Sequence, residues 1–368
     1  MSQARPFALA FAAQFLGFGA ALPFLPAILA AGGLTPGEVG TVLAAGSVIR
    51  LLSAPLLGQW ADRTGDVRRV LFAAALVAGL AALGFGLLAG FALLLAVQLL
   101  HAAAAAPVMP LTDALALRAG GFDYARVRAV GSVAFIAGAV LAGFLADATG
   151  PRATAFLLAG GMFATALAAP RLPRPPPRPP GEAQSGPLWA PWREAGFRRL
   201  LPLSAAVQGS HAVLYGFSAI HWQASGLSPG QVGLLWAVGV VAEILLFLKG
   251  GALTAMLGKR GLALLAAGAG VVRWGATAVV TDFWVLLPLQ ALHGLTFGAM
   301  HLAAMRALLE LPAPLAARAQ TLHVAGVGAA MGSLTFAGGW LYAGVGGLAF
   351  WAMAALCVLA LPLAARLR

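Results

Sequence analysis

The residues of this sequence that are most able to take part in chemistry are ionisable side chains inside long apolar stretches. Glu243 lies in VVAEILLF and Arg273 lies in VVRWGAT, each with apolar neighbours. An apolar surrounding disfavours the charged form of a carboxylic acid, so Glu243 is the first candidate for a group that exchanges a proton near neutral pH. Arginine keeps its charge and needs an anionic partner, either a carboxylate of the protein or an anionic ligand. A static ion pair of Glu243 with Arg273 or Arg50 is the alternative.

Polar and aromatic residues recur at helical spacing in two of these stretches. One helix face carries Gln290, His293, Phe297 and His301, and another carries Gln208, His211, Tyr215, Ser218 and Trp222. Inside a membrane such a face is expected to line a wet cavity, because hydrocarbon offers no hydrogen-bond partner. A neutral histidine can also carry a proton, which makes His293 a second proton-coupling candidate.

A further acid and base stand at the ends of consecutive apolar stretches. Asp113 lies in PLTDALALR and Arg128 lies in DYARVRAVGS. The two are expected at similar depth on neighbouring helices, where an ion pair forms easily. The alternative for Arg128 is a side chain that extends to the cytoplasmic interface.

These groups must be held by helices that cross a bilayer. Of the 368 residues, 61% are hydrophobic and only 9% are charged, whereas a soluble domain has about 25% charged residues. So few charges could not cover so much apolar surface in water, so the composition predicts an integral membrane protein. The net charge of +12 does not indicate nucleic-acid binding, because most arginines lie in short gaps between apolar stretches.

Breaks at Pro, Gly and charge clusters divide the chain into twelve apolar segments of about the length that a crossing needs. The predicted segments are 6–30, 38–60, 70–89, 91–117, 125–148, 152–170, 198–223, 230–256, 261–280, 283–309, 316–342 and 346–365. Lys and Arg are concentrated in the loops of one side, so the positive-inside rule places both termini in the cytoplasm. We expect a multi-pass protein of the bacterial inner membrane.

The sequence also indicates two related halves. Residues 171–197 are rich in Pro and Arg and are predicted to form a solvated cytoplasmic linker between a bundle at 1–170 and a bundle at 198–368. The segment GLTPGEVG at Gly33 returns as GLSPGQVG at Gly226, and QLLH at Gln98 returns as QALH at Gln290. The predicted fold class is an all-α membrane protein with twelve transmembrane helices in two pseudo-symmetric six-helix bundles.

The repeat offset has a consequence for the charged residues. It places Arg50 of the second segment in correspondence with Glu243 of the eighth, each about 13 residues into its helix and so near the midplane. A cation in one half matched by a carboxylate in the other is an arrangement that a central binding site could use.

The loop GQWADRTGDVRR, which begins at Gly58, resembles the signature loop of the major facilitator superfamily. Its residues Asp62, Arg63 and Arg69 are candidates for biasing a cytoplasmic gate. The stretches PLTDALAL, DYARVRAVGSVAF, YGFSAIHWQASGLSP, VGVVAEILLF, VVRWGA and QALHGLTFG resemble the phenylpropionate permease branch, which is related to the lactose permease and to nucleoside:proton symporters. The resemblance implies a proton-coupled importer that works by alternating access.

The correspondence with the lactose permease is partial. Its sugar-binding Glu and Arg, its second acidic sugar ligand, its essential Arg and its His match Asp113, Arg128, Glu243, Arg273 and His293. Thr296 stands where that permease has its proton-carrying Glu, Gln290 stands where it has a Lys, and Phe135 stands where its Trp stacks on the sugar. Coupling therefore cannot use the same carboxylate, and Glu243 becomes the expected proton site.

These observations predict a proton-coupled symporter that imports a small aromatic carboxylate such as a phenylpropionate-like acid. The proton-coupling candidates are Glu243, His293 and Asp113, and the substrate-binding candidates are Arg273, Arg128, Arg50, Tyr215, Trp222, Phe135, Phe18 and Gln290. No nucleotide, zinc, dinucleotide or serine-nucleophile motif occurs, so we expect no enzyme activity, no metal and no cofactor, with the proton gradient as the energy source. The expected partners are a small-molecule substrate, protons and the lipid bilayer, without nucleic acid, and the chain is expected to be a monomer.

Three alternatives remain open at this point. The first is a proton-coupled importer of neutral sugars or nucleosides, in which Asp113 and Glu243 would bind hydroxyl groups. The second is a drug/proton antiporter. The third is a membrane protein that senses or binds a partner without transport.

Overall fold

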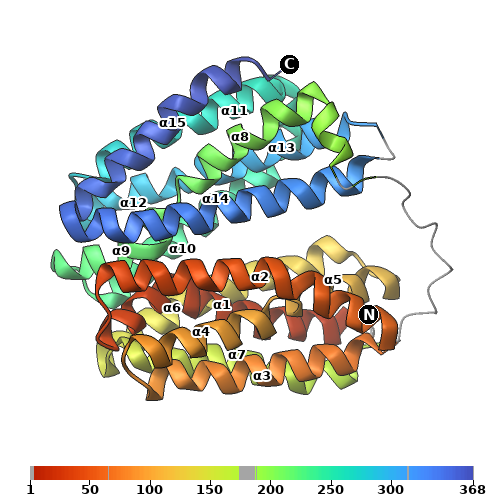
Figure 1. Cartoon of the computed structure of the whole chain (residues 1–368), viewed down its shortest axis with the longest axis vertical. Helices are drawn as coiled ribbons and strands as arrows, with labels where there is room; N and C mark the ends of the chain where they lie inside the picture. The colour runs from red at the N-terminus through yellow and green to blue at the C-terminus, as the bar shows by residue number, and fades with distance from the viewer. Residues whose placement is uncertain (1–3, 65, 174–186, 188, 313–314, 368) are drawn as a thin grey trace. The chain divides into compact units, whose positions relative to one another are not determined.

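The computed structural model describes residues 4–64, 66–173, 187, 189–312 and 315–367, and helices dominate this part of the chain (Figure 1). The first helices are α1 (Ala4–Ala31), α2 (Pro36–Thr64), α3 (Val67–Leu87), α4 (Phe91–Ala105), α5 (Val108–Ala119), α6 (Tyr124–Thr149) and α7 (Thr154–Ala168). They are followed by α8 (Ala195–Gly209), α9 (Ala212–Ala224), α10 (Pro229–Leu248), α11 (Gly250–Thr277), α12 (Phe283–Ala291), α13 (Met300–Leu309), α14 (Ala316–Val345) and α15 (Ala349–Ala365). The prediction of an all-α protein is confirmed.

Ten helical segments among the described residues are long and apolar enough to cross a bilayer. One of them, Arg318–Ala365, contains both α14 and α15, which are separated at Gly346 with φ of 57°. Helices α8 and α9 have 15 and 13 residues and are separated at Ser210, so neither alone reaches the required length. These two features account for the difference between ten segments and the twelve predicted.

Proline and glycine set breaks inside the predicted spans. Pro107 lies between α4 and α5, where its missing N–H interrupts the helical hydrogen bonds. Gly258, with φ of 59°, is non-helical inside α11 and is therefore the boundary between the eighth and ninth predicted spans. Of the predicted linker 171–197, residues 174–186 and 188 lie outside the described part. The 3₁₀ turn Ala190–Arg193 follows, and α8 already begins at Ala195.

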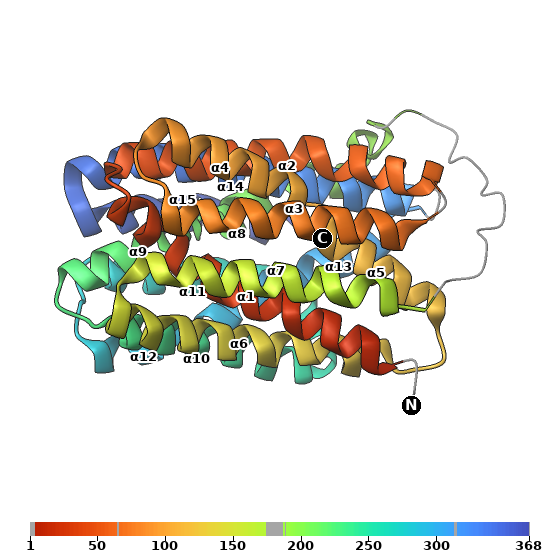
Figure 2. The same cartoon turned by 90° about the horizontal axis from the view of Figure 1, so that it is seen from below.

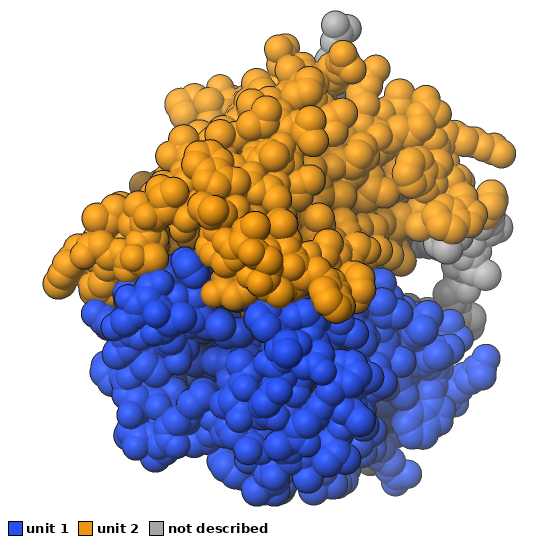
Figure 3. Space-filling view, turned by 60° about the vertical axis from the view of Figure 1, so that its left-hand side comes forward, with its two compact units in different colours: residues 1–178, 217–237 blue, residues 179–216, 238–368 orange. Residues whose placement is uncertain are grey.

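The chain forms two compact units, coloured separately in Figure 3. Unit 1 comprises Met1–Arg178 with Phe217–Ala237, and unit 2 comprises Pro179–Gly216 with Val238–Arg368. In unit 1, α1 packs along α6 and α7, and α3 packs against α7 and α4 (Figure 2). In unit 2, α11 packs along α15 and α13, and α8 packs against α14. Each unit has a buried apolar core of its own.

Glycines allow the closest helix contact of unit 1, between α1 and α6. A Cβ added to Gly19 would lie 2.1 Å from the carbonyl oxygen of Phe135, and one added to Gly138 would lie 2.1 Å from that of Leu16. Backbone oxygens cannot rotate aside, so the two helices approach this closely only because both positions are glycine.

Gly138→Ala is therefore expected to destabilise the protein, because the new methyl group must push α1 away from α6. Overpacking costs about 1–3 kcal/mol and occasionally more, and a clash with backbone belongs to the upper end. The matched control is Gly160→Ala on α7 of the same unit, where an added Cβ meets nothing within 4 Å. In detergent, thermal unfolding should show a Tm several degrees lower for Gly138→Ala than for Gly160→Ala. Equal Tm values would contradict this packing.

Candidate functional site

Arg273 of α11 is the centre of a buried polar cluster in unit 2. Its side chain is almost fully enclosed, with 1% of the residue exposed. Nη1 donates to Thr296 Oγ1 at 2.9 Å, and Nη2 donates to Gln290 Oε1 at 2.8 Å. The guanidinium carbon also lies 4.5 Å from the ring centroid of Trp274. These oxygen acceptors are uncharged, and Nε has no hydrogen-bond partner among the described residues.

His293 connects this guanidinium to a carboxylate. Its Nδ1 lies 3.2 Å from Arg273 Nη1, and its Nε2 lies 3.2 Å from Glu243 Oε2. Since Arg273 can only donate, Nδ1 must accept, and the ring proton is assigned to Nε2, which donates to Glu243. A neutral imidazole thus separates the cation from the anion. Within the described residues, the direct Glu243–Arg273 ion pair considered from the sequence does not form.

His211 completes the cluster from the break between α8 and α9. Its Nδ1 lies 3.1 Å from the carbonyl oxygen of Gln208, so this nitrogen carries the proton and Nε2 accepts. The Thr296 hydroxyl, 3.0 Å from Nε2, accepts from Arg273 and donates to His211. The hydrogen bonds thus join Arg273, Thr296, His211, His293, Gln290 and Glu243 into one connected network.

Close helix packing brings Glu243 to this network. A Cβ added to Gly294 would lie 2.7 Å from the carbonyl oxygen of Ala242 on α10, so the glycine permits α10 to approach the segment that begins at residue 294. The segment Gly294–Ala299 between α12 and α13 is a π-helix, a widened turn often found at functional sites.

The π-helix also aligns three aromatic rings of the predicted stripe. The rings of His293 and Phe297 lie 5.4 Å apart and are 12° from parallel, and those of Phe297 and His301 lie 6.4 Å apart and are 6° from parallel. His301 interacts electrostatically with Glu243. A column of rings therefore extends along this helix from the Arg273 cluster past Glu243.

Unit 1 contains a second polar cluster, where α1, α5 and α6 meet. Arg128 Nε lies 3.5 Å from Asp113 Oδ1, and the Tyr124 hydroxyl donates to the same oxygen at 2.9 Å. The guanidinium of Arg128 lies 4.2 Å from the ring centroid of Phe15 and 5.4 Å from that of Phe11. The structure brings Asp113 and Arg128 together as expected, and adds Tyr124 and the two phenylalanines, which the sequence did not single out.

The other substrate-binding candidates occupy varied environments. Phe18 is 37% exposed and its ring lies 5.7 Å from the buried ring of Phe135. Tyr215 lies with its ring 5.6 Å from that of His211. Arg50 is exposed on α2, with no hydrogen bond or ion pair to a described residue. Trp222 is fully buried, so its ring is enclosed by protein in this conformation.

The gating candidates lie at the two helix ends that the signature segment joins, Asp62 and Arg63 in the last turn of α2 and Arg69 in the first turn of α3. Arg69 pairs with Asp66 at 3.2 Å, and Arg68 donates to the carbonyl oxygen of Leu172 beyond α7 at 3.0 Å. Arg63 is exposed, and the side chain of Asp62 lies outside the described part of the structure. The partner of Arg69 is thus local, three residues away along the chain.

Two residues of the Arg273 network were assigned neither proton coupling nor substrate binding from the sequence. Thr296 stood out only as the replacement of a glutamate, and His211 stood out only as a member of a helical stripe. Their sequence distances from Arg273 are 23 and 62 residues, and no local pattern joins positions so far apart.

Comparisons with known proteins find similar sequences over most of the chain. A family model described as "MFS_1 like family" matches residues 8–353. The "Probable 3-phenylpropionic acid transporter" of Escherichia coli (strain K12) is 36% identical, over 98% of this chain and 96% of the relative. The "Maltose permease" of Geobacillus stearothermophilus is 27% identical, over 77% of this chain and 73% of the relative.

Solved structures show the same fold. The nucleoside transporter NupG superposes with a TM-score of 0.84 at 15% identity, covering 98% of both chains. A bacterial homolog of the human lysosomal transporter Spinster, in an inward-facing conformation, gives a TM-score of 0.76 at 14% identity, covering 99% of this chain and 95% of that chain. The predicted fold class is confirmed by these likenesses.

Proposed function

This chain belongs to the MFS_1 like family of multi-pass membrane transporters, and we propose that it is a proton-coupled symporter that imports a small aromatic carboxylate. Its relatives are transporters rather than enzymes. The 36% identity with a probable 3-phenylpropionic acid transporter over nearly the whole chain supports the substrate class. Alternating access of the two halves of the molecule would move the substrate.

One observation carries the proposal: Arg273 is buried and bonded, within the described residues, only to neutral acceptors. A buried cation without an adjacent anion is unfavourable. A substrate carboxylate would provide that anion, and the planar guanidinium can hold it with two parallel hydrogen bonds. The substrate oxygens would then replace Gln290 Oε1 and Thr296 Oγ1 as the acceptors of the Arg273 hydrogen bonds.

The proton would be carried by Glu243. While ionised, this carboxylate accepts from His293 and offsets the charge of Arg273 through the imidazole ring. Protonation removes that negative charge, so a substrate anion becomes more favourable beside Arg273. Binding of the proton and of the substrate are then mutually reinforcing, which is what symport requires thermodynamically. His301, next along the ring column, is a natural acceptor when the proton leaves Glu243.

Asp113 is proposed as a further proton-coupling residue and Arg128 as a further substrate-binding residue. In this proposal Asp113 and Arg128 are held as a pair by Tyr124 and by two phenylalanine rings. Phe18, Phe135 and Tyr215 supply aromatic surface, and Arg50 attracts the anion. Asp62, Arg63 and Arg69 bias the cytoplasmic gate.

The location and partners belong to the same proposal. The chain would reside in the bacterial inner membrane as a monomer, with both termini in the cytoplasm. The concentration of arginines in the loops of one side supports this orientation. The proton gradient would be the energy source, without a cofactor.

The test is uptake by purified protein in proteoliposomes. We expect 3-phenylpropionate and related aryl carboxylates to accumulate when the outside is made acidic, and neutral sugars and nucleosides not to accumulate. A flat response of aryl carboxylate uptake to the gradient would contradict symport. Gradient-driven uptake of maltose or a nucleoside instead would favour the neutral-solute importer, and proton-driven movement of a lipophilic cation would favour the antiporter.

A further inference from the structure

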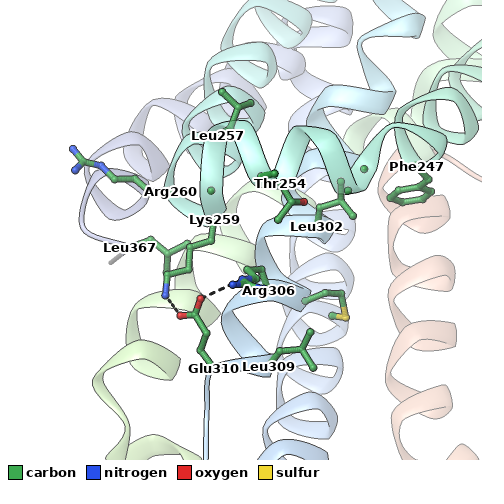
Figure 4. Close-up of a pocket in the computed structure, with 15 residues that line it drawn as sticks. Phe247, Thr254, Leu257, Lys259, Arg260, Leu302, Arg306, Leu309, Glu310 and Leu367 are labelled. Atoms are coloured by element: carbon green, nitrogen blue, oxygen red, sulfur yellow. Dashed lines mark hydrogen bonds and ion pairs between the residues drawn. The ribbon is translucent and has the colours of Figure 1, made fainter.

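A groove opens at the helix ends of unit 2, between the end of α10, the start of α11 and the end of α13 (Figure 4). Its volume is about 1020 Å³. Its polar lining includes the side chains of Lys259, Arg260, Arg306, Glu310 and Thr254. Much of the remaining lining is apolar and includes Phe247, Leu257, Leu302, Met305, Leu309 and Leu367. The groove is distinct from the Arg273 cluster, with which it shares no residue.

The groove carries an excess of positive charge. Glu310 forms ion pairs with both Lys259 and Arg306, the latter at 3.5 Å (Figure 4). The exposed Arg260 adds a third cation that has no ion pair with a described residue. The groove lining therefore contains one carboxylate and three cations. The carbonyl groups at the end of α13 reduce this excess only by a partial charge, so the groove favours an anion.

Apolar side chains flank these charges on the outer surface. Leu309, Leu248 and Met256 are 78%, 75% and 72% exposed, and Leu309 also lines the groove. Lys259 is only 18% exposed, so its ammonium group is held beside Glu310 at the groove. A cationic groove with an apolar border at the ends of transmembrane helices matches an anionic lipid better than a soluble anion. The cations can bind the headgroup, and the apolar border can contact the acyl chains.

We propose that this groove binds an anionic phospholipid. Lys259 and Arg306 would donate to the headgroup phosphate, Arg260 would add charge at the rim, and an acyl chain would lie along Leu302, Met305 and Leu309. Glu310 holds the two cations in position and would share them with the phosphate. This site is independent of the substrate and of the proposed proton coupling.

The experiment compares lipids by thermal unfolding of the purified full chain in detergent. Phosphatidylglycerol should raise the Tm of the wild-type protein by at least about 2 °C relative to phosphatidylcholine, because a ligand of the folded state stabilises it. In the variant Lys259→Gln/Arg306→Gln this difference should disappear. The matched control, Arg198→Gln/Arg199→Gln, removes two exposed cations of α8 in the same unit and should keep it.

Three results would overturn the proposal. The first is an equal response of both double variants to phosphatidylglycerol, and the second is a wild-type Tm that does not distinguish the two lipids. The third is the same rise with inorganic phosphate alone, which would indicate a site for a free anion rather than a lipid. Should the Lys259→Gln/Arg306→Gln variant not fold, native mass spectrometry of the wild type still decides. Phosphatidylglycerol adducts must outnumber phosphatidylcholine adducts, and equal numbers overturn the proposal.

Discussion

Replacing Arg273 by Gln is expected to reduce uptake of 3-phenylpropionate to the level of empty liposomes. The substitution removes the only group in the buried cluster that keeps a fixed positive charge. A hydrogen bond to a charged group contributes about 1.5–3 kcal/mol, which corresponds to a loss of affinity of about 10- to 150-fold for the substrate carboxylate. Initial uptake rates and quenching of tryptophan fluorescence measure the effect, since Trp274 lies under the guanidinium.

Two further variants distinguish the effect of the Arg273 charge on uptake from the effect of its guanidinium geometry and from a general effect of removing an arginine. Arg273→Lys keeps the charge but loses the two-pronged geometry, so we expect an intermediate affinity. Arg199→Gln removes an exposed arginine of the same unit and should leave uptake unchanged. Transport of the acid by a folded Arg273→Gln protein at the wild-type rate would refute the role of this residue. Loss of acid uptake together with gain of a neutral substrate would support it.

Glu243→Gln is expected to abolish accumulation against a gradient while exchange continues. Glutamine resembles a permanently protonated glutamic acid, so the relay through His293 stays in the state that favours the substrate. A wild-type symporter that moves one proton per carboxylate should accumulate substrate about tenfold for each pH unit across the membrane. In Glu243→Gln the accumulation ratio should be about one.

The measurement pairs gradient-driven uptake with counterflow of labelled 3-phenylpropionate in the same proteoliposomes. Counterflow shows that the variant is folded and still binds substrate, and uptake shows whether it is coupled to protons. Glu194→Gln, at the start of α8 in the same unit, is the matched control and should retain both activities. Gradient-driven accumulation by Glu243→Gln at the wild-type ratio would exclude Glu243 as the proton carrier.

Parts of the site could be predicted because their determinants are local. Asp113 and Arg128 lie on the consecutive helices α5 and α6, which a short turn joins, so their pairing at 3.5 Å follows from adjacency along the chain. The stripe of His293, Phe297 and His301 follows from helical periodicity, although its parallel rings depend on the π-helix at Gly294–Ala299. Glycine and proline marked several helix boundaries for the same local reason.

Other features depend on packing between distant helices. The indirect link from Arg273 through His293 to Glu243 requires α10, α11 and the segment that carries His293 to meet at one point. From the sequence, a direct pair of Glu243 with Arg273 or Arg50 was only the alternative. The participation of Thr296 and His211 has the same origin. A hydrogen bond depends on the distance and direction between two side chains, and these are set by how far each helix can approach its neighbour.

By itself, the sequence determined that this is a helical membrane protein with ionisable groups inside its apolar segments, because apolar length and the placement of charge are read along the chain. It also determined the family, through motifs that lie within single segments. Only the tertiary structure decided which of those groups bond to one another and which nitrogen of His211 and of His293 is assigned the proton. It likewise decided that a cationic groove is formed where three helix ends come together. The physical reason is that burial and hydrogen-bond geometry are properties of contacts between helices, and no single helix contains them.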